Sequence, residues 1–323
     1  MARIRAVLLI AMLAAPAGAQ QMPDIYDVDA AHSQVGFVVR FMGMTNVRGA
    51  FADVGGTIMY SEGRPERSSV AVVIQTASIN TNNGTRDRDL RSPNFFAADS
   101  FPVITFRSTQ VTRAAGDRFV ARGPLTIRGI TREVEIPFVR MHAPVKDAWG
   151  NTNVGFAGTL KLNRKDFNIL GTKFWNSEFD PGRMSIADTV EVELAIEGKV
   201  DNLDRWNTPK TDSIVTAVET EGAAAVVARY REAAKSDSTL RLRSEGTLNV
   251  SARKLMQHGR AKDAIPLLQL SAELNPTSTR PLVYLGRAYL QAGDRASAKA
   301  QFASAAKLDP LEVRATEALR YLP

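Results

Sequence analysis

The stretch VEVELAIE, residues 190–197, places a large apolar side chain at every second position and a glutamate or alanine between them. Successive side chains of a β-strand point to opposite faces, so this order gives one dry face and one wet face. A helix would need an apolar period near 3.6, which the stretch does not have. It therefore predicts an antiparallel strand with one face in water.

The same period-two pattern recurs from Tyr26 to about Lys199. Turn signals such as Gly55-Gly56 and Arg128-Gly129 separate the runs, and a stretch rich in Arg and Asp, residues 85–96, predicts a short helix or an ordered loop. About eight strands without a long parallel crossover predict a closed antiparallel barrel or a sandwich.

The inward positions of these strands carry many large side chains. An eight-stranded barrel either fills its interior with side chains or holds one small ligand there. The pattern alone leaves both interpretations open, and a filled core is the simpler one. The inward phenylalanines are Phe37, Phe41, Phe51, Phe106, Phe138 and Phe156.

From about Thr211 the apolar period becomes helical, and residues 213–235 predict one alanine-rich helix. Farther along, Leu274-Asn275-Pro276 recurs as Leu308-Asp309-Pro310, an offset of 34 residues, which is the period of tetratricopeptide helix pairs. The sequence therefore predicts a β-barrel followed by an α-helical domain. The expected bounds are a barrel domain over 20–201, a linker over 202–212 and a helical domain over 213–323, with repeats at about 246–276 and 279–310 and a capping helix over 311–322.

The first residues have the pattern of an export signal. Arg3 and Arg5 precede an apolar run, residues 6–15, and Ala17-Gly18-Ala19 follows. The run is too short to span a bilayer, and the small residues match a signal-peptidase site, so we expect cleavage after Ala19. The mature chain is then predicted to be periplasmic or secreted, with no transmembrane anchor. Removal of two arginines lowers the net charge from +7 to +5.

Residue types limit the chemistry. The 323 residues include no cysteine and three histidines, which excludes disulfides and thiolate sites. No nucleophile elbow, phosphate loop or zinc-protease motif occurs, so we predict no enzymatic activity, no cofactor and no metal site. Basic residues alternate with acidic ones, which argues against nucleic acid as a partner. His32 and Ser33 are neighbours on a strand and point apart, so His32 is expected to make a structural hydrogen bond near the barrel mouth.

The charged run from Arg86 to Arg91 has two interpretations. Its arginines could bind an anionic head group through paired hydrogen bonds. They could equally form ion pairs that close one end of the barrel. The polar residues singled out at this mouth are His32, Arg86, Asp87 and Arg88.

Residues 26–199 resemble the YceI family, also called polyisoprenoid-binding-like. The resemblance rests on an ordered set of motifs. They are Tyr26-Asp27-Val28-Asp29 with His32-Ser33, Val47-Arg48-Gly49-Ala50-Phe51, Ala77-Ser78-Ile79-Asn80-Thr81 with Arg86-Asp87 and Leu90-Arg91-Ser92, Phe101-Pro102-Val103-Ile104-Thr105-Phe106, Gly123-Pro124-Leu125-Thr126-Ile127-Arg128-Gly129-Ile130-Thr131, and Asn163-Arg164-Lys165-Asp166-Phe167.

The resemblance implies a lipocalin-like, eight-stranded barrel with a helical insertion and an apolar tunnel for an isoprenoid or other amphiphilic lipid. Phe41 and Asp89 stand where the family often has histidine, so head-group preference does not carry over. With the inward parity, the resemblance predicts a set of cavity-lining residues. These are Phe37, Val39, Phe41, Ile74, Phe106, Ile127, Phe138 and Phe156, with Phe96, Phe101, Phe174 and Trp175 at an end and Leu160, Phe167 and Ile186 as weaker candidates.

The leading hypothesis is an exported lipid-binding barrel whose helical repeats contact a protein partner. The alternative is a periplasmic interaction scaffold with an unoccupied barrel, and a lipid hydrolase is a distant third.

Overall fold

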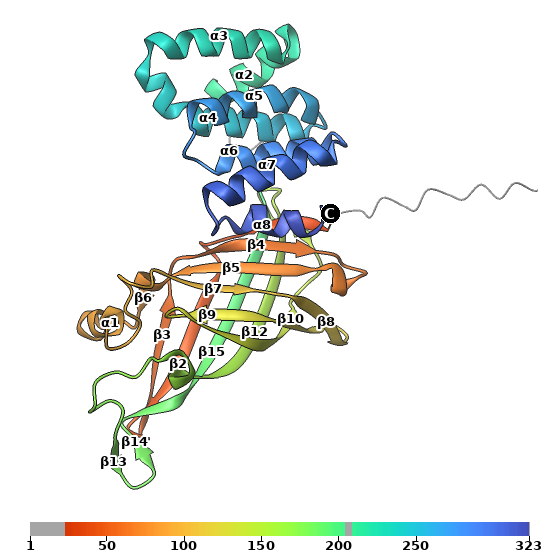
Figure 1. The fold of residues 1–323 in the computed structure, drawn as a ribbon. Coiled ribbons are helices and arrows are strands. Elements are labelled where there is room, and N and C mark those ends of the chain that lie inside the picture. Colours follow the sequence, from red (N-terminus) through yellow and green to blue (C-terminus); the bar gives the residue numbers. More distant parts are fainter. Residues whose placement is uncertain (1–22, 204–208, 323) are drawn as a thin grey trace, which may run out of the picture.

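The computed structural model describes residues 23–203 and 209–322. The predicted signal peptide, residues 1–19, and Trp206 of the predicted linker lie outside these ranges. The described chain forms a β-barrel with a stack of helices on one end (Figure 1). No helix in the described part of the chain is long and apolar enough to cross a membrane.

Eight consecutive antiparallel strands close the barrel, each paired with the next and the last paired with the first. This confirms the predicted barrel over a sandwich. Four of the eight strands bend and therefore carry two labels. The strands are β1 (Asp24–Val28) with β2 (Gln34–Phe41), β3 (Thr45–Phe51) with β4 (Val54–Tyr60), β5 (Ser69–Gln75) with β6 (Ile79–Asn80), β7 (Val103–Arg107) with β8 (Gln110–Ala115), β9 (Arg118–Ile127), β10 (Ile130–Arg140), β12 (Thr152–Asn163) and β15 (Ile186–Val200).

Three short strands lie outside this ring. Strand β11 (Val145–Lys146) pairs antiparallel with the start of β12, and β13 (Glu178–Asp180) with β14 (Arg183–Met184) forms a separate hairpin. Short 3-10 helices cover Pro65–Arg67, Thr76–Ser78 and Arg164–Phe167.

The alternating stretch 190–197 lies in β15, where the barrel closes. Val192 is opposite Phe37 of β2 on one side and Leu160 of β12 on the other. Residues directly opposite one another in antiparallel strands share a face, so all three side chains point into the barrel. The intervening glutamates face outward, as the sequence pattern predicts.

Helix α1 (Gly84–Arg91) begins one residue before the predicted stretch 85–96, covers its first half and sits beside one end of the barrel (Figure 1). The side chain of Asn83 caps it by accepting the Arg86 backbone N–H at 3.0 Å. On the same end, Arg128 and Gly129 both have positive φ (51° and 72°), as a two-residue type I′ hairpin turn requires. Arg128 is held there because its guanidinium donates to three backbone carbonyls, those of Phe95, Asn168 and Pro93.

The helical part contains α2 (Pro209–Glu221), α3 (Ala223–Ser236), α4 (Ser238–Gln257), α5 (Ala261–Leu274), α6 (Arg280–Gln291), α7 (Arg295–Leu308) and α8 (Val313–Arg320). The single helix predicted over 213–235 is wrong, because the chain breaks at Gly222 with φ of 88° and continues as a second helix. Helix α2 begins at Pro209, inside the range predicted as linker.

The predicted repeat has a clear physical basis. Gly259 and Gly293, one period apart, both have positive φ (76° and 88°) in the turns that join α4 to α5 and α6 to α7. A Cβ atom on Gly286 would lie 2.7 Å from the Phe302 ring, so glycine is what allows α6 and α7 to approach. Phe302 is fully buried as a result.

The helical part is attached to the barrel through α8. Glu317 is completely buried and accepts hydrogen bonds from Ser69 at 2.7 Å and from the Arg107 guanidinium. Arg320 donates to the Ser108 carbonyl at 2.7 Å, and the Tyr321 hydroxyl donates to the Arg67 carbonyl at 2.8 Å. The barrel wall thus packs on a helix that would otherwise end the repeat stack in water.

Candidate ligand-binding cavity

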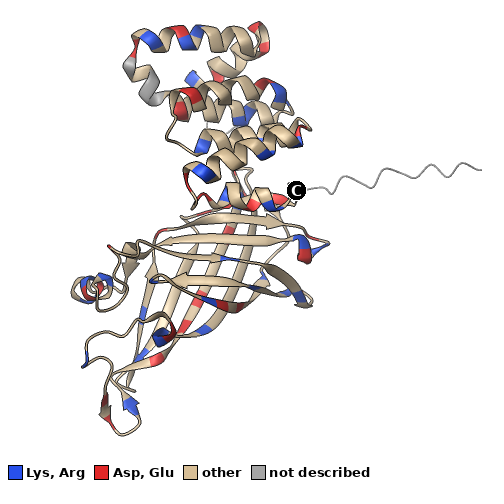
Figure 2. Cartoon of the chain, in the orientation of Figure 1, with Lys and Arg blue, Asp and Glu red and all other residues tan. Residues whose placement is uncertain are grey.

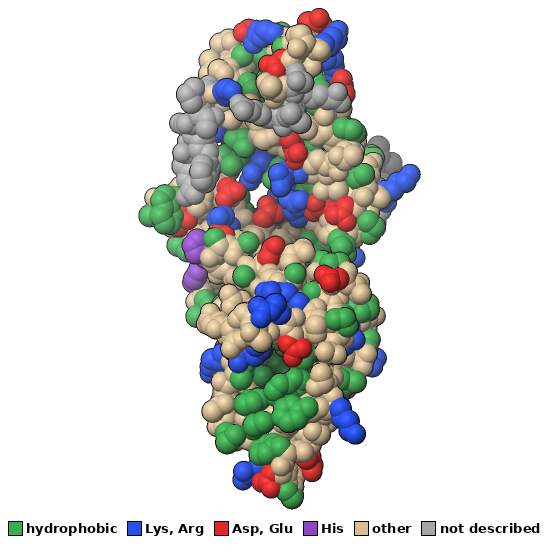
Figure 3. Space-filling view, turned by 90° about the vertical axis from the view of Figure 1, so that its left-hand side faces the viewer, with side chains coloured by type: hydrophobic (Ala, Val, Ile, Leu, Met, Phe, Trp, Pro, Cys, Tyr) green, Lys and Arg blue, Asp and Glu red, His purple; other side chains and the backbone are tan. Residues whose placement is uncertain are grey.

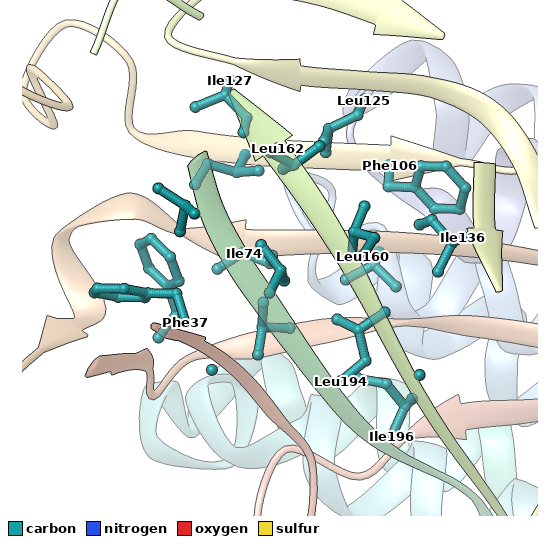
Figure 4. Close-up of a pocket in the computed structure, with 18 of the residues that line it drawn as sticks. Phe37, Ile74, Phe106, Leu125, Ile127, Ile136, Leu160, Leu162, Leu194 and Ile196 are labelled. Atoms are coloured by element: carbon teal, nitrogen blue, oxygen red, sulfur yellow. The ribbon is translucent and has the colours of Figure 1, made fainter. Parts of the chain in front are cut away.

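The barrel encloses a cavity of about 660 Å³, within the size range of small-molecule sites. Inward side chains from every strand of the barrel line it, and those labelled in Figure 4 converge on one space. Most of the lining is apolar. The sequence-predicted residues on this wall are Phe37, Val39, Phe41, Ile74, Phe96, Phe106, Ile127, Phe138, Phe156 and Trp175, together with the weaker candidates Leu160, Phe167 and Ile186.

Several aromatic rings in the barrel form three separate groups. Near the helical part, Tyr60, Phe156, Phe138 and Phe119 follow one another with ring centroids 6.0, 5.7 and 5.4 Å apart. A second group, Phe37, Phe51 and Phe96, lies on the side of α1. The third joins Phe41 to Trp175 at 6.0 Å. Because the rings pack against the wall and against each other, the space between them is free.

The cavity mouth is marked by residues that both line the cavity and reach the surface. On α1 and its cap these are Asn83, Thr85, Arg86 and Asp89. In the view of Figure 3, hydrophobic side chains surround a hollow in the lower half of the barrel, below this charged helix. The entrance to the cavity is therefore apolar, with polar groups on one side.

Two predicted lining residues lie elsewhere. Phe101 packs beneath the hairpin turn, where its ring is 2.8 Å from the position of a Cβ on Gly129. Phe174 is 54% exposed and contacts Trp175 edge-on, with ring centroids 4.7 Å apart. Of these neighbouring aromatic residues, only Trp175 turns inward.

The charged run on α1 is held mainly by hydrogen bonds to Thr81. Arg86 donates from Nε to the Thr81 hydroxyl at 2.7 Å and from Nη2 to the Thr81 carbonyl at 2.8 Å. Asp87 is buried and accepts from the Thr81 backbone and hydroxyl at 2.9 and 2.6 Å. Arg88 bonds Thr85 and does not line the cavity. Hydrogen bonds to the chain, rather than the ion pairs considered from sequence, fasten this helix across the barrel end.

Arg164 is a lining residue that the sequence-predicted site omitted. It is 5% exposed and donates to the carbonyls of Ile169 and Leu170 at 2.8 Å each, and to Ala187 at 3.1 Å. Burial lowers the pKa of this guanidinium, and the Asp188 carboxylate opposes that shift. Arg164 therefore holds the segment that carries Trp175. Arg164 belongs to the Asn163–Phe167 motif of the family resemblance, and this motif could have identified it from the sequence.

Other omitted lining residues follow the same inward parity, so the pattern could have found them. Val192, Leu194 and Ile196 lie in the alternating stretch itself. The rest include Val35, Phe51, Ile58, Tyr60, Val72, Ile104, Phe119, Leu125, Ile136 and Leu162.

His32 lies outside the cavity, in the bend between β1 and β2. Its Nδ1 is 3.0 Å from Asp29 Oδ2, and the hydrogen bond to Asp29 raises the pKa of this exposed imidazole. Burial favours a higher pKa for Asp29, but hydrogen bonds from Lys199 and His32 outweigh it and lower the pKa to about 2. Potential metal ligands of Asp29, His32 and Glu197 lie within 4.8 Å of one another, yet Lys199 Nζ already contacts Asp29 Oδ2 at 2.7 Å.

Low pH should lower the free energy of unfolding, because Asp29 becomes protonated. Its pKa falls from 3.8 to about 2 on folding, so its contribution is present above pH 3.8 and is lost as the pH drops toward 2. The corresponding free energy is about 2 kcal/mol. Urea unfolding at pH 5 and pH 2.5 should show a smaller acid-induced loss in Asp29→Asn than in the wild type. The exposed Asp99, changed to Asn, is the control, and equal losses in all three proteins would refute the assignment.

Together these features define a closed eight-stranded antiparallel barrel with an apolar interior, joined to a helical-repeat stack. The chain belongs to the YceI-like domain family, whose model matches residues 26–198. A tetratricopeptide-repeat model matches residues 255–320. Both predicted resemblances are confirmed.

Relatives cover the barrel part of the chain. A UPF0312 protein of Vibrio cholerae serotype O1 is 31% identical over 195 residues, 60% of this chain and 96% of that protein. A UPF0312 protein of Ectopseudomonas mendocina is 36% identical over 183 residues, 56% and 90% of the two chains. Among solved structures, BcnA of Burkholderia cenocepacia has a TM-score of 0.46 at 22% identity. The match covers 53% of this chain and 98% of BcnA. A polyisoprenoid binding domain from Saccharophagus degradans has a TM-score of 0.42 at 17% identity. The match covers 55% of this chain and 98% of that domain.

Proposed function

We propose that this protein binds one amphiphilic lipid and holds its isoprenoid-type tail in the barrel. The observation that carries the proposal is the apolar cavity of about 660 Å³, which runs from the aromatic group at Tyr60 to the mouth at Phe41 and α1. Each methylene moved from water into such a space contributes about 0.8 kcal/mol. Ten of them would contribute about 8 kcal/mol before the entropic costs of association. A long tail is thus retained by apolar contact alone.

Arg86 supplies a contact for the polar end of the lipid. It lines the mouth, and its Nε and Nη2 atoms are committed to Thr81, which fixes the guanidinium in place. The remaining Nη1 makes no hydrogen bond within the described chain, so a head-group oxygen is a suitable partner. The acidic Asp89 on the same rim disfavours a strongly anionic group close to it. This geometry supports binding rather than catalysis.

We propose that the helical repeats contact a partner protein. Contacts with the barrel side already occupy part of the helical surface. Arg253 of α4 pairs with Asp201 at 3.3 Å, and Arg287 of α6 pairs with Asp27 at 3.0 Å. Helix α8 is docked through Glu317. The first helix of each pair, and the capping helix, thus face the barrel. Because this side faces the barrel, we place the partner on the second helix of each pair, α5 and α7.

Native mass spectrometry of the protein from its producing cell tests the proposal. We expect a noncovalently bound apolar mass that is lost after solvent extraction, on a polypeptide that begins at Gln20 if the chain is exported as proposed. If the protein carries no lipid and takes up neither an isoprenoid quinone nor a hydrophobic fluorophore, the lipid-binding function is wrong. The alternative of a scaffold with an unoccupied barrel would then be favoured.

A further inference from the structure

Three large apolar side chains are exposed at the end of the barrel that lies farthest from the helices. Met44 is 63% exposed, Phe174 54% and Phe179 41%. Single exposed apolar residues are common on soluble proteins and need no explanation, but a group of them marks an interaction site. These three come from two segments, the turn between β2 and β3 and residues 171–185, which contain the β13–β14 hairpin (Figure 1).

The two segments form one surface. The Met42 backbone N–H donates to the Ser185 carbonyl at 3.0 Å. A Cβ on Gly43 would lie 3.6 Å from Arg183 Cδ, which places the turn directly against the hairpin. Main-chain contact of this kind keeps the exposed side chains on the same end of the molecule.

This surface continues into the cavity mouth. Phe174 packs edge-on against Trp175, and Trp175 packs against Phe41, with centroids 4.7 and 6.0 Å apart. Trp175 and Phe41 both line the cavity, whereas Phe174 is outside it. The rings of Phe174, Trp175 and Phe41 thus connect the exposed surface to the cavity wall.

The charges around the mouth have a positive balance. The two segments carry Lys173 and Arg183 against Glu178 and Asp180, Arg40 of β2 adjoins the turn, and α1 on the other side carries three arginines against two aspartates. Six basic residues against four acidic ones leave a net charge of +2, and both signs are visible around the lower barrel end in Figure 2. Apolar side chains within a mildly basic rim match the acyl chains and anionic head groups of a bilayer.

We propose that this end of the barrel docks on a phospholipid bilayer that contains anionic lipid. Met44, Phe174 and Phe179 enter the head-group region, and the cavity mouth then faces the acyl chains. A lipid can pass along the Phe174–Trp175–Phe41 path without exposing its tail to water. The inference rests on the proposed lipid-binding function, of which it names the loading surface.

Flotation with vesicles of phosphatidylcholine and phosphatidylglycerol (3:1) tests the docking. The wild type should float with the vesicles, and less of it should do so with pure phosphatidylcholine or at high salt, because salt screens the rim charges. In the mouth variant, Met44, Phe174 and Phe179 are all replaced by serine. Its vesicle partitioning should fall at least about ten-fold, since the variant lacks the apolar side chains that enter the bilayer.

A matched control is available at the end of the barrel near the helices. Met141, Val145 and Trp149 are 63, 52 and 62% exposed, and their replacement by serine should leave flotation unchanged within about two-fold. Loss of flotation in both triple variants, or in neither, would overturn the docking surface. So would a wild type that stays in solution, or a dimer in sedimentation velocity that only the mouth variant abolishes.

Uptake of a hydrophobic fluorophore from solution separates the two proposals. The mouth variant should retain uptake, because its three residues do not line the cavity. If the wild type floats but takes up no fluorophore, the cavity function fails while docking stands. If it takes up the fluorophore but does not float, docking alone fails.

Discussion

The variant Leu160→Glu should lose at least about 100-fold in affinity for an apolar ligand. Leu160 projects into the cavity from β12, opposite Val192 of β15 (Figure 4). A carboxylate at this point must either stay hydrated, which occupies the space of the tail, or lose its water beside apolar groups, which costs several kcal/mol. The fluorophore dissociation constant and the bound mass in native mass spectrometry report the change.

Thr159→Glu is the matched control for this variant. Thr159 is the preceding residue on the same strand and is exposed, so the same charge is added on the outer face. Affinity should be unchanged there. Because a buried carboxylate can also prevent folding, Leu160→Trp is a second variant that narrows the cavity at the same point without adding charge and should likewise weaken binding. Full affinity in both Leu160→Glu and Leu160→Trp would show that the ligand does not use this part of the cavity.

The variant Glu317→Ala should lower the free energy of unfolding by about 3 kcal/mol. Glu317 is fully buried between α8 and the barrel, where it pairs with Arg107 and with Arg320 and accepts from Ser69. Removing one member of a buried charge network leaves the others without their partner, which typically costs 3–5 kcal/mol. Partial exposure of both arginines places the expected value at the lower end. Urea unfolding measures the change.

Loss of this contact should also loosen the attachment of α8 to the barrel. Hydrogen exchange should then accelerate in α8 and in the facing strands β4 and β5, and remain slow in β12. The exposed Glu232 of α3, changed to alanine, is the control and should shift stability by less than about 0.5 kcal/mol. If Glu317→Ala behaves like this control, Glu317 does not hold α8 on the barrel.

Several features of this protein followed from local sequence. Alternation in residues 190–197 established which β15 side chains point inward, because a strand has a period of two. The 34-residue offset identified the helix pairs, and Gly286 and Phe302 show why small residues recur at those places. The prediction of one helix over 213–235 is wrong for a local reason too. Gly222 adopts a positive φ, which a continuous helix cannot contain.

The cavity itself could not be derived from the pattern. Inward phenylalanines are equally compatible with a filled core, and only their arrangement into wall-bound groups leaves the interior open. Phe174 and Trp175 are neighbours of the same type, yet one is exposed and the other lines the cavity. Their orientation depends on the segment that Arg164 holds through backbone carbonyls, a contact no periodicity describes.

Sequence by itself thus determined the two architectures and the absence of cysteine, because these follow from composition, from short-range periodicity and from a repeat of 34 residues. Tertiary structure decided whether the barrel is hollow, where it opens and how the helices attach to it. Arg287 and Asp27 pair across 260 positions, and Glu317 and Ser69 across 248. Such contacts arise from the closure of the barrel and the stacking of the repeats, so no local pattern contains them.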